Sequence, residues 1–180
     1  PLLNTPQTVS VIPKELFKEQ GAASLMDALR NTPGITMQLG ENGATSAGDT
    51  FQLRGFSAQS SMFVDGVRDL GAVTRDTFNI EQVEVVKGPA GADIGRGASA
   101  GYINLVSKLP SRTDAISAEA SLNTAGASRI TGDLNKAFGA SSAVRLNVMA
   151  QGGDVQNRDR VENTSLGFAP SLAFGLGTPT

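Results

Sequence analysis

Two β-rich runs joined by a glycine-dense loop constrain the fold of this chain more than any other feature. The runs are residues 82–87 and 102–106, and the loop between them carries Gly88, Gly91, Gly95, Gly97 and Gly101. Glycine has no Cβ atom, so a backbone this rich in glycine can turn sharply or lie against another surface. We therefore predict that Gly88, Gly95, Gly97 and Gly101 are structural turn positions and that the two runs pair as strands.

The segments before these runs mix helix and strand signals. Residues 7–12 alternate with period two and predict a strand that ends at Pro13. Residues 14–20 predict a short helix stopped by a glycine. Ser24 and Asp27 resemble a capping box that opens a second helix running to Asn31.

Further short strands are predicted at residues 35–39 and 51–56, with a polar loop at 40–49 between them. Apolar residues flank Asp65-Gly66, a dipeptide whose residues both tolerate positive φ, which predicts a hairpin. The pattern indicates a small α+β unit with a mixed β-sheet and short helices.

Residues 113–180 follow a different rule, because apolar and polar residues alternate along four successive runs. The apolar positions are Ile116, Ala118, Ala120 and Leu122; Ile130, Gly132, Leu134 and Phe138; Val144, Leu146, Val148 and Ala150; and Leu166, Phe168, Leu172, Phe174 and Leu176. The alternate face carries Glu119, Arg129, Asp133, Arg145 and Asn147. Such side chains suit a wet lumen better than a packed core, and each run is about as long as a tilted membrane strand of ~9–11 residues.

Four strands of this kind cannot close into a membrane barrel. Known barrels need at least ~8 strands, and an open edge in lipid leaves amides unpaired at several kcal/mol each. The sequence therefore predicts that these strands belong to a longer chain. By the same parity Leu146 faces lipid and Asn147 faces the lumen, so Leu146→Arg is expected to cost ~2–4 kcal/mol near the midplane and Asn147→Arg to be mild.

Composition excludes most catalytic and metal-binding chemistry. The 180 residues include no cysteine and no histidine, so there is no thiolate, no imidazole base and none of the commonest transition-metal ligands. The formal net charge of −2 gives no electrostatic reason to expect nucleic acid or an anionic membrane surface. We expect neither an enzyme nor a metal bound directly by the protein.

Five segments together resemble the plug of TonB-dependent outer-membrane siderophore receptors. They occur in order and at familiar spacing: TPQTVSVIP (5–13), SLMDALRNTPGI (24–35), FQLRGF (51–56), MFVDGVRD (62–69) and FNIEQVEVVKGPAGADIGRGASAGYINLVSK (78–108). The last segment is most similar to the catecholate-type ferric-siderophore receptors. The alternating runs that follow lie where the barrel of that family begins.

The resemblance implies an α+β plug domain over residues 1–112, followed over 113–180 by the first antiparallel strands of a transmembrane β-barrel of about 22 strands. It implies a receptor of the bacterial outer membrane, in contact with lipid and monomeric when complete, that transports a ferric siderophore. TonB would supply the energy by pulling on a short box ahead of the plug. No such box precedes Thr5, so we expect it outside this chain.

The resemblance also implies an electrostatic lock between plug and barrel. Arg54, in LRGF, and Lys87, in VVKGP, match positions where the family places basic residues that face acidic barrel residues. A plug in a water-poor lumen must pair its charges, and lysine lacks the bidentate geometry of arginine, so the contact of Lys87 is expected to be weaker. Their acidic partners are expected beyond Thr180. The alternative is that both are ordinary solvated strand charges.

Three plug loops face outward by motif position, at residues 40–49, 57–61 and 69–73. They are polar with few charges, which suits a ligand recognised by hydrogen bonds and shape. The candidate contact residues are Asn42, Gln59, Ser60 and Leu70, and the alternative is that the loops are flexible connectors. Iron is expected only as a ferric siderophore, whose own donors saturate the metal.

Other functions fit less of the sequence. A phosphate-binding enzyme would use the loop at 88–101, but GxxxxGK[ST] is absent and β-like YINLV follows in place of a helix. A soluble β-rich interaction module explains the alternation but not the charged alternate face. A TonB-dependent receptor for cobalamin, a sugar or another metal chelate stays open, because a plug alone hardly separates these ligands.

Overall fold

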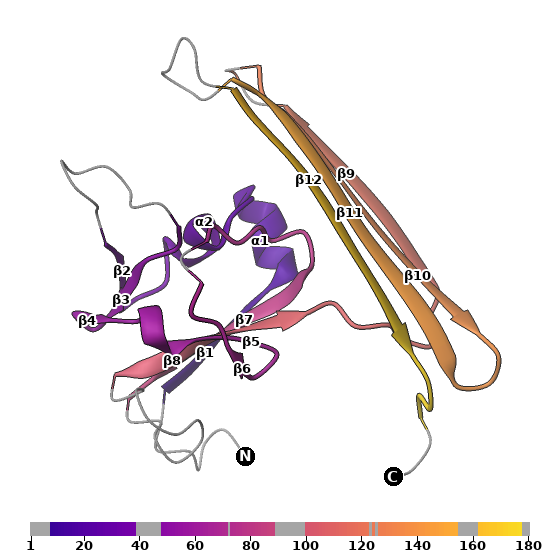
Figure 1. Cartoon of the computed structure of the whole chain (residues 1–180), viewed down its shortest axis with the longest axis horizontal. Coiled ribbons are helices and arrows are strands. Elements are labelled where there is room, and N and C mark those ends of the chain that lie inside the picture. The colour runs from indigo at the N-terminus through magenta and orange to yellow at the C-terminus, as the bar shows by residue number, and fades with distance from the viewer. Residues whose placement is uncertain are drawn as a thin grey trace. The chain divides into compact units, whose positions relative to one another are not determined.

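The chain forms two compact units, Pro1–Ser107 and Lys108–Thr180, both shown in Figure 1. The structure is a computed structural model, and it describes residues 8–38, 48–71, 73–88, 100–122, 124, 126–154 and 162–177. Among these residues no helix has both the length and the apolar character needed to cross a membrane.

A five-stranded mixed sheet organises the first unit, in the order β1-β7-β8-β5-β6. Its strands are β1 (Thr8–Pro13), β5 (Met62–Val64), β6 (Val67–Arg68), β7 (Ile80–Lys87) and β8 (Gly101–Ser107). The predicted pairing of the two β-rich runs is confirmed, because β7 and β8 are antiparallel neighbours. Strand β5 adds to β8 in parallel, and β5 and β6 form the predicted hairpin.

The Asp65-Gly66 turn and Gly101, which the structure places at the start of β8 and not in a turn, each need a residue that tolerates positive φ. In the hairpin, Asp65 and Gly66 have φ of 50° and 78°, which suits a tight two-residue turn. Gly101 has φ of 119°, and a Cβ atom there would lie 1.9 Å from the carbonyl oxygen of Val86. Gly88 also has positive φ but open space around it, whereas Gly95 and Gly97 lie outside the described residues.

The two helices, α1 (Lys14–Gln20) and α2 (Leu25–Leu29), lie next to each other beside β7 in Figure 1. The predicted N-cap is confirmed, since the Asp27 amide donates to Ser24 Oγ at 3.2 Å, and the Ser24 hydroxyl donates in turn to Asp27 Oδ2 at 2.8 Å. The second helix is shorter than the prediction, which ran to Asn31. The amide of Thr32 bonds back to the carbonyl of Leu29 at 2.9 Å, a tightened last turn before a proline that disfavours helix in the preceding residue.

A second sheet of the first unit has the order β2-β3-β4, with β2 at Ile35–Met37, β3 at Phe51–Leu53 and β4 at Phe56–Ser57. The prediction of one strand over residues 51–56 was wrong. Arg54 and Gly55 have φ of 51° and 86°, so the backbone makes a tight turn that splits the run into two paired strands. The short 3₁₀ helix η3 (Gln59–Ser61) follows β4.

One hydrophobic core lies between the helices and the two sheets of the first unit. Its most buried large side chains are Leu25, Leu29, Phe51, Leu53, Val83, Val85, Ile103 and Leu105. Every member of this core cluster lies in the first unit. The predicted α+β architecture is therefore confirmed, and the helices pack through their apolar faces.

The second unit is a single antiparallel sheet in the order β12-β11-β10-β9. The strands are β9 (Ala115–Leu122), β10 (Ser128–Phe138), β11 (Ser142–Asp154) and β12 (Glu162–Ala173). The predicted alternation is confirmed: the register aligns Ile116, Leu134 and Leu146 across the sheet, and next to them Ser117, Asp133 and Asn147. The apolar face is open, with Ile116, Leu122 and Leu166 each more than four-fifths exposed.

Candidate functional site

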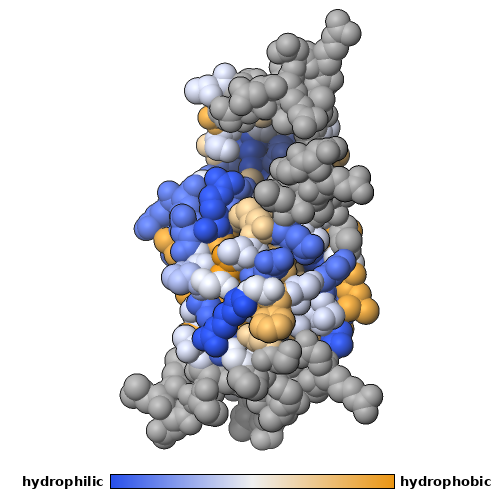
Figure 2. Space-filling model, turned by 90° about the vertical axis from the view of Figure 1, so that its left-hand side faces the viewer, coloured by the Kyte–Doolittle hydropathy of each residue, from blue (hydrophilic) through white to orange (hydrophobic). Residues whose placement is uncertain are grey.

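A shallow polar depression lies on the first unit, lined by Ser57, Gln59, Ser60 and Leu70, with a volume of about 330 Å³. It brings together three of the four residues predicted to contact a ligand, and Asn42 lies outside the described residues. Figure 2 shows one face of the molecule, where hydrophilic side chains predominate and hydrophobic ones are scattered. Ligand contact at this depression stays a prediction.

One wall of the depression is built by the end of β4 and by η3. The amide of Gln59 donates to Ser57 Oγ at 3.4 Å, and the amide of Ser61 donates to the carbonyl of Ala58 at 2.9 Å. Ala58 and Ser61 are buried, whereas Gln59 and Ser60 are exposed. The inner residues thus fix the short helix and leave the two polar side chains free to meet a ligand.

Leu70 forms the opposite part of the depression and lies in a tight turn. Asp69 Oδ1 accepts the amide of Gly71 at 2.9 Å, and the amide of Asp69 donates to the carbonyl of Met62 at 2.9 Å. The Leu70 side chain is 66% exposed. An apolar side chain presented to water by a hydrogen-bonded turn is suited to contact an apolar part of a ligand.

Arg75 holds this turn. Its Nε and Nη2 donate to Asp69 Oδ2 at 3.0 and 2.7 Å, and Nη2 also donates to the Gly71 carbonyl at 2.8 Å. Its Nη1 donates to the Val73 carbonyl at 3.0 Å, and its backbone amide donates to Asp49 Oδ2 at 2.8 Å. The residue is only 9% exposed, so these hydrogen bonds form away from bulk water. We call Asp49, Asp69, Gly71, Val73 and Arg75 the Arg75 network.

The pKa values of the two carboxylates of the Arg75 network are shifted in opposite directions. Burial raises the pKa of Asp49, although the hydrogen bonds and charge of Arg75 oppose that shift. The hydrogen bond from the Gly71 amide, followed by those from Arg75, lowers the pKa of Asp69. Asp49 Oδ1 is buried without a hydrogen-bond partner among the described residues. Asp69 is therefore the more strongly stabilised anion of the pair.

The two residues predicted to form the lock both lie beside Gly34. Arg54 is exposed in the turn between β3 and β4, and its amide donates to the Gly34 carbonyl at 2.9 Å. Lys87 ends β7 and is buried, and its Cε lies 3.8 Å from the position of a Cβ atom on Gly34. Within the described ranges neither side chain forms an ion pair, so their partners stay a prediction.

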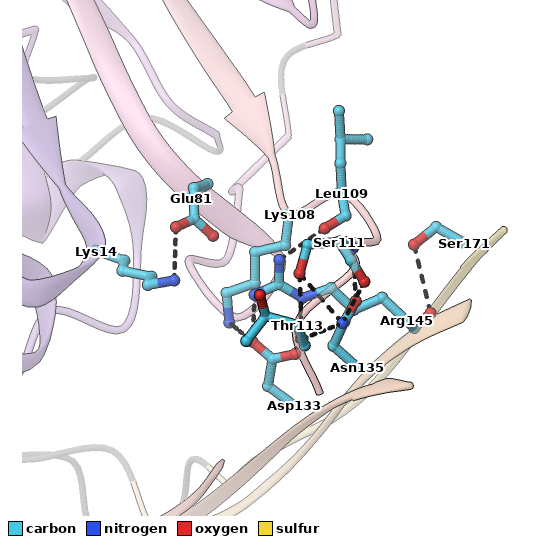
Figure 3. A network of polar contacts seen from close by, with 10 residues as sticks. All are labelled: Lys14, Glu81, Lys108, Leu109, Ser111, Thr113, Asp133, Asn135, Arg145 and Ser171. Atoms are coloured by element: carbon cyan, nitrogen blue, oxygen red, sulfur yellow. Dashed lines mark hydrogen bonds and ion pairs between the residues drawn. The ribbon is translucent and has the colours of Figure 1, made fainter. Parts of the chain in front are cut away.

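A second polar cluster joins the start of the second unit to its strands, as Figure 3 shows. Asp133 on β10 forms a bidentate pair with Arg145 on β11, with Nε–Oδ1 and Nη2–Oδ2 distances of 2.9 and 2.8 Å. Lys108 Nζ lies 3.3 Å from the same Asp133 Oδ2, and Arg145 Nη1 donates to the Leu109 carbonyl at 2.8 Å. The Asp133 carboxylate thus forms ion pairs with two cations.

Asn135 extends this cluster along the chain. Its Nδ2 donates to the carbonyls of Ser111 and Thr113 at 2.8 and 2.7 Å, and its Oδ1 accepts the Ser111 amide at 2.9 Å. We call Lys108, Leu109, Ser111, Thr113, Asp133, Asn135 and Arg145 the linker network. Because it uses backbone groups of residues 109–113, it fixes the segment after β8 to the polar face of β10 and β11.

Sequence reasoning missed Arg75 as a positioning residue, and it missed the linker network. The Arg75 partners Asp69, Gly71 and Val73 lie two to six residues away, but no motif at these positions signals a buried arginine, and Asp49 is 26 residues away. The linker network had a usable signal. The short turn at residues 139–141, between the second and third runs, sets their register, and that register places opposite charges of Asp133 and Arg145 on neighbouring strands of one face.

Comparison with known proteins identifies the class. The TonB-dependent Receptor Plug Domain family matches residues 1–102. The chain is 48% identical over 179 residues to the catecholate siderophore receptor Fiu of Escherichia coli K12, covering 99% of this chain and 24% of the relative. It is 42% identical over 181 residues to the probable TonB-dependent siderophore receptor PiuA of Acinetobacter baumannii, covering 100% of this chain and 24% of the relative.

The fold agrees with these matches. The crystal structure of the ferric-catecholate import receptor Fiu from E. coli K12, in its closed form, superposes with a TM-score of 0.91 at 48% identity. The match covers 99% of this chain and 25% of the other. The chain therefore belongs to the TonB-dependent receptor plug family. It has the α+β plug fold followed by antiparallel strands like the start of a barrel, and it spans about a quarter of the length of these relatives.

Proposed function

We propose that this chain is the plug and the first barrel strands of a bacterial outer-membrane receptor that takes up ferric siderophores of the catecholate type. The observation that carries the proposal is the 48% identity to a catecholate siderophore receptor, which extends over 99% of this chain and so includes both units. The activity is transport powered by TonB, and the complete barrel is monomeric in lipid. Nucleic acid is not a partner.

Both units have features that support this function. The open apolar face of β9–β12 suits contact with lipid, and the charged opposite face suits a wet lumen. The polar depression of the first unit suits a ligand bound by hydrogen bonds and shape. In this proposal the strands form part of the barrel wall, and the first unit forms part of the surface that binds the siderophore.

Iron is the cargo and enters as a siderophore complex. The chain has no histidine or cysteine, and the described residues contain no group of three acidic side chains that could hold an ion. A siderophore supplies its own oxygen donors, so the protein recognises the outside of the complex. No resident cofactor is proposed.

Uptake of radioactive iron tests the proposal directly. The full-length receptor with this plug is expressed in bacteria that lack their own catecholate receptors, and uptake of the ferric 2,3-dihydroxybenzoate complex is measured with and without TonB. We expect uptake only when both the receptor and TonB are present. A ferric hydroxamate complex is the control, and uptake of that complex alone would contradict the catecholate assignment.

We also propose that Arg54 and Lys87 pair with acidic barrel residues and so hold the plug in the closed barrel. The backbone of Arg54 and the side chain of Lys87 both lie next to Gly34, which supports a shared contact region. Arg54→Ala is expected to raise the conductance of the full-length receptor in planar bilayers, and Lys87→Ala to have a smaller effect of the same sign. Arg30→Ala is the control, because Arg30 is two-thirds exposed and pairs with Asp27 within α2. Conductance equal to that of the unmodified receptor in the Arg54 variant would refute the lock.

A further inference from the structure

We propose that Arg75 is a positioning residue for ligand recognition: it fixes the turn of residues 69–71 and thereby holds Leu70 at the edge of the polar depression. The inference rests on the proposed function, in which that depression takes part in binding the siderophore complex. Arg75 itself does not line the depression, so it acts through the residues that it holds.

The hydrogen bonds of the guanidinium concentrate on both sides of Leu70. Asp69 receives two of them and the Gly71 carbonyl receives a third, at distances of 2.7–3.0 Å. The Leu70 side chain is 66% exposed, so little packing of its own restrains it. Its position is therefore set by its two neighbours, and both neighbours are held by the same arginine.

The same arginine ties a second predicted ligand loop to this turn. Asp49, at the end of the loop predicted over residues 40–49, accepts the Arg75 amide at 2.8 Å and lies 3.5 Å from its Nη1. The amide of Asp49 donates to the Val73 carbonyl at 3.1 Å. Asp49 and Arg75 are both buried, so the connection is shielded from water. Arg75 thus joins Asp49, the last residue of that predicted loop, to the turn that carries Leu70.

Only arginine can make this set of contacts. The guanidinium offers five N–H donors in a planar fork, and here they reach two carboxylates and two backbone carbonyls. A lysine has three donors on one atom, so it can at best reproduce the bonds of Nη2 to Asp69 and Gly71. It loses the second bond to Asp69 from Nε and the bonds of Nη1 to Val73 and Asp49. A glutamine also removes the charge and leaves buried acceptors without donors.

The test measures binding of the ferric 2,3-dihydroxybenzoate complex to the purified full-length receptor in detergent. Arg75→Gln and Arg75→Lys are each expected to weaken binding about tenfold or more, which corresponds to ~1.4 kcal/mol. The matched control is Arg30→Gln, an exposed arginine paired within its own helix, which is expected to bind like the unmodified receptor. Asp69→Asn is expected to weaken binding to the same extent as the Arg75 substitutions. It tests the inference if the Arg75 variants fail to fold.

A double-mutant cycle separates positioning from general stability. Leu70→Ala is expected to weaken binding severalfold in the unmodified receptor and to have no further effect in the Arg75→Lys background. Hydrogen exchange of residues 69–71, measured without ligand, is expected to speed up in Arg75→Lys while the β7 and β8 amides keep their protection. A purely structural role would instead give additive losses of affinity and faster exchange throughout the first unit.

The outcomes distinguish the two proposals. If the unmodified receptor does not bind the complex, the proposed function fails and this inference fails with it. If the unmodified receptor binds while the Arg75 variants bind equally well, the inference is overturned and the proposed function stands. Additive effects of Arg75→Lys and Leu70→Ala would also overturn the inference.

Discussion

The two units differ in which large side chains they bury and which they expose. In the first unit the most deeply buried large residues are apolar, and they come from both helices and both sheets. In the second unit the buried side chains include Asn135 and Asn147, at 2% and 0% exposure, whereas Ile116 and Leu166 are more than four-fifths exposed. The first unit thus has a core of its own, and the second presents its apolar surface to its surroundings.

The stability of each unit therefore has a different source. Removing apolar surface from water contributes roughly 25 cal/mol per Å², so the first unit gains stability from packing within itself. In the proposed outer-membrane receptor, the second unit gains that term only when lipid and further strands cover its open face and edges. Its internal side-chain contacts include the polar ones of the linker network and the ring pair of Phe138 and Phe174. Substitutions are expected to act differently in the two units for this reason.

The largest loss of stability is expected at a close backbone contact of the first unit. Gly101→Ala is expected to destabilise the plug by about 3–5 kcal/mol, since positive φ and a clash with the Val86 carbonyl act together. Urea unfolding of the full-length receptor in detergent, followed by hydrogen exchange of β7 and β8, measures this. Gly66→Ala is the control: it has positive φ but open space, so a cost near ~1 kcal/mol is expected. Similar costs for the two would contradict the close contact.

The next effect tests the lipid-facing side of the second unit. Leu146→Arg is expected to cost about 2–4 kcal/mol near the bilayer midplane, measured by urea unfolding of the receptor in lipid vesicles. The sequence predicted that Asn147→Arg would be mild, and the structure corrects this, because Asn147 is fully buried. Arginine there is now expected to overpack the site at a cost of about 1–3 kcal/mol.

A suitable control for the lumen side is Ser117→Arg. Ser117 is exposed and lies opposite Asp133 in the register, so the new cation points to the same face as that carboxylate. A cost well below that of Leu146→Arg is expected. If the two substitutions cost the same, the assignment of the faces is wrong.

A smaller effect probes the polar contacts of the second unit. Asp133→Asn is expected to cost about 1.5–3 kcal/mol, because it takes the anion from two largely buried cations, Lys108 and Arg145. Arg30→Gln breaks an exposed ion pair of the first unit and is expected to cost below ~1 kcal/mol. Urea unfolding measures both. A cost for Asp133→Asn no larger than that for Arg30→Gln would show that the linker network adds little stability.

Much of the fold could be predicted, because its signals are local. Period-two alternation gave the four strands of the second unit, and Asp65-Gly66 gave the hairpin between β5 and β6. The split between β3 and β4 was missed because Arg54 adopts a positive φ that arginine rarely takes. Gly55 was the only sequence signal for the turn, and the apolar residues Leu53 and Phe56 on either side favoured a continuous strand instead.

The candidate site was harder to predict than the fold. Motif position suggested Gln59, Ser60 and Leu70, and the structure brings these three together. Arg75 was missed because residues 69–75 match no motif that signals a buried arginine, although three of its partners lie within six residues of it. Asn147 was misjudged because parity gives the face of a residue and not what covers it. Burial decides both cases, and a single sequence carries little signal for it.

The smallest expected effect is a loss of stability of the first unit at acid pH, which arises from Asp69. The pKa of Asp69 is lowered in the folded state from an ordinary value of 3.8 by the Gly71 amide and by Arg75. A lowered pKa means that the folded state binds the proton less tightly than the unfolded state. The stabilisation is therefore complete above about pH 4 and is lost as the pH falls through the folded pKa. Solvent screens this carboxylate, which is one-third exposed, so the effect is modest.

Asp69→Asn isolates this contribution from that of Asp49, whose raised pKa means that its own contribution to stability falls as the pH rises. The variant is expected to be less stable than the unmodified receptor at pH 6 and to lose less stability between pH 6 and pH 3. Urea unfolding at both values measures the two losses. Equal losses would mean that Asp69 does not carry the acid sensitivity of the turn. The contacts that hold Leu70 at the depression would then persist whether or not that carboxylate is charged.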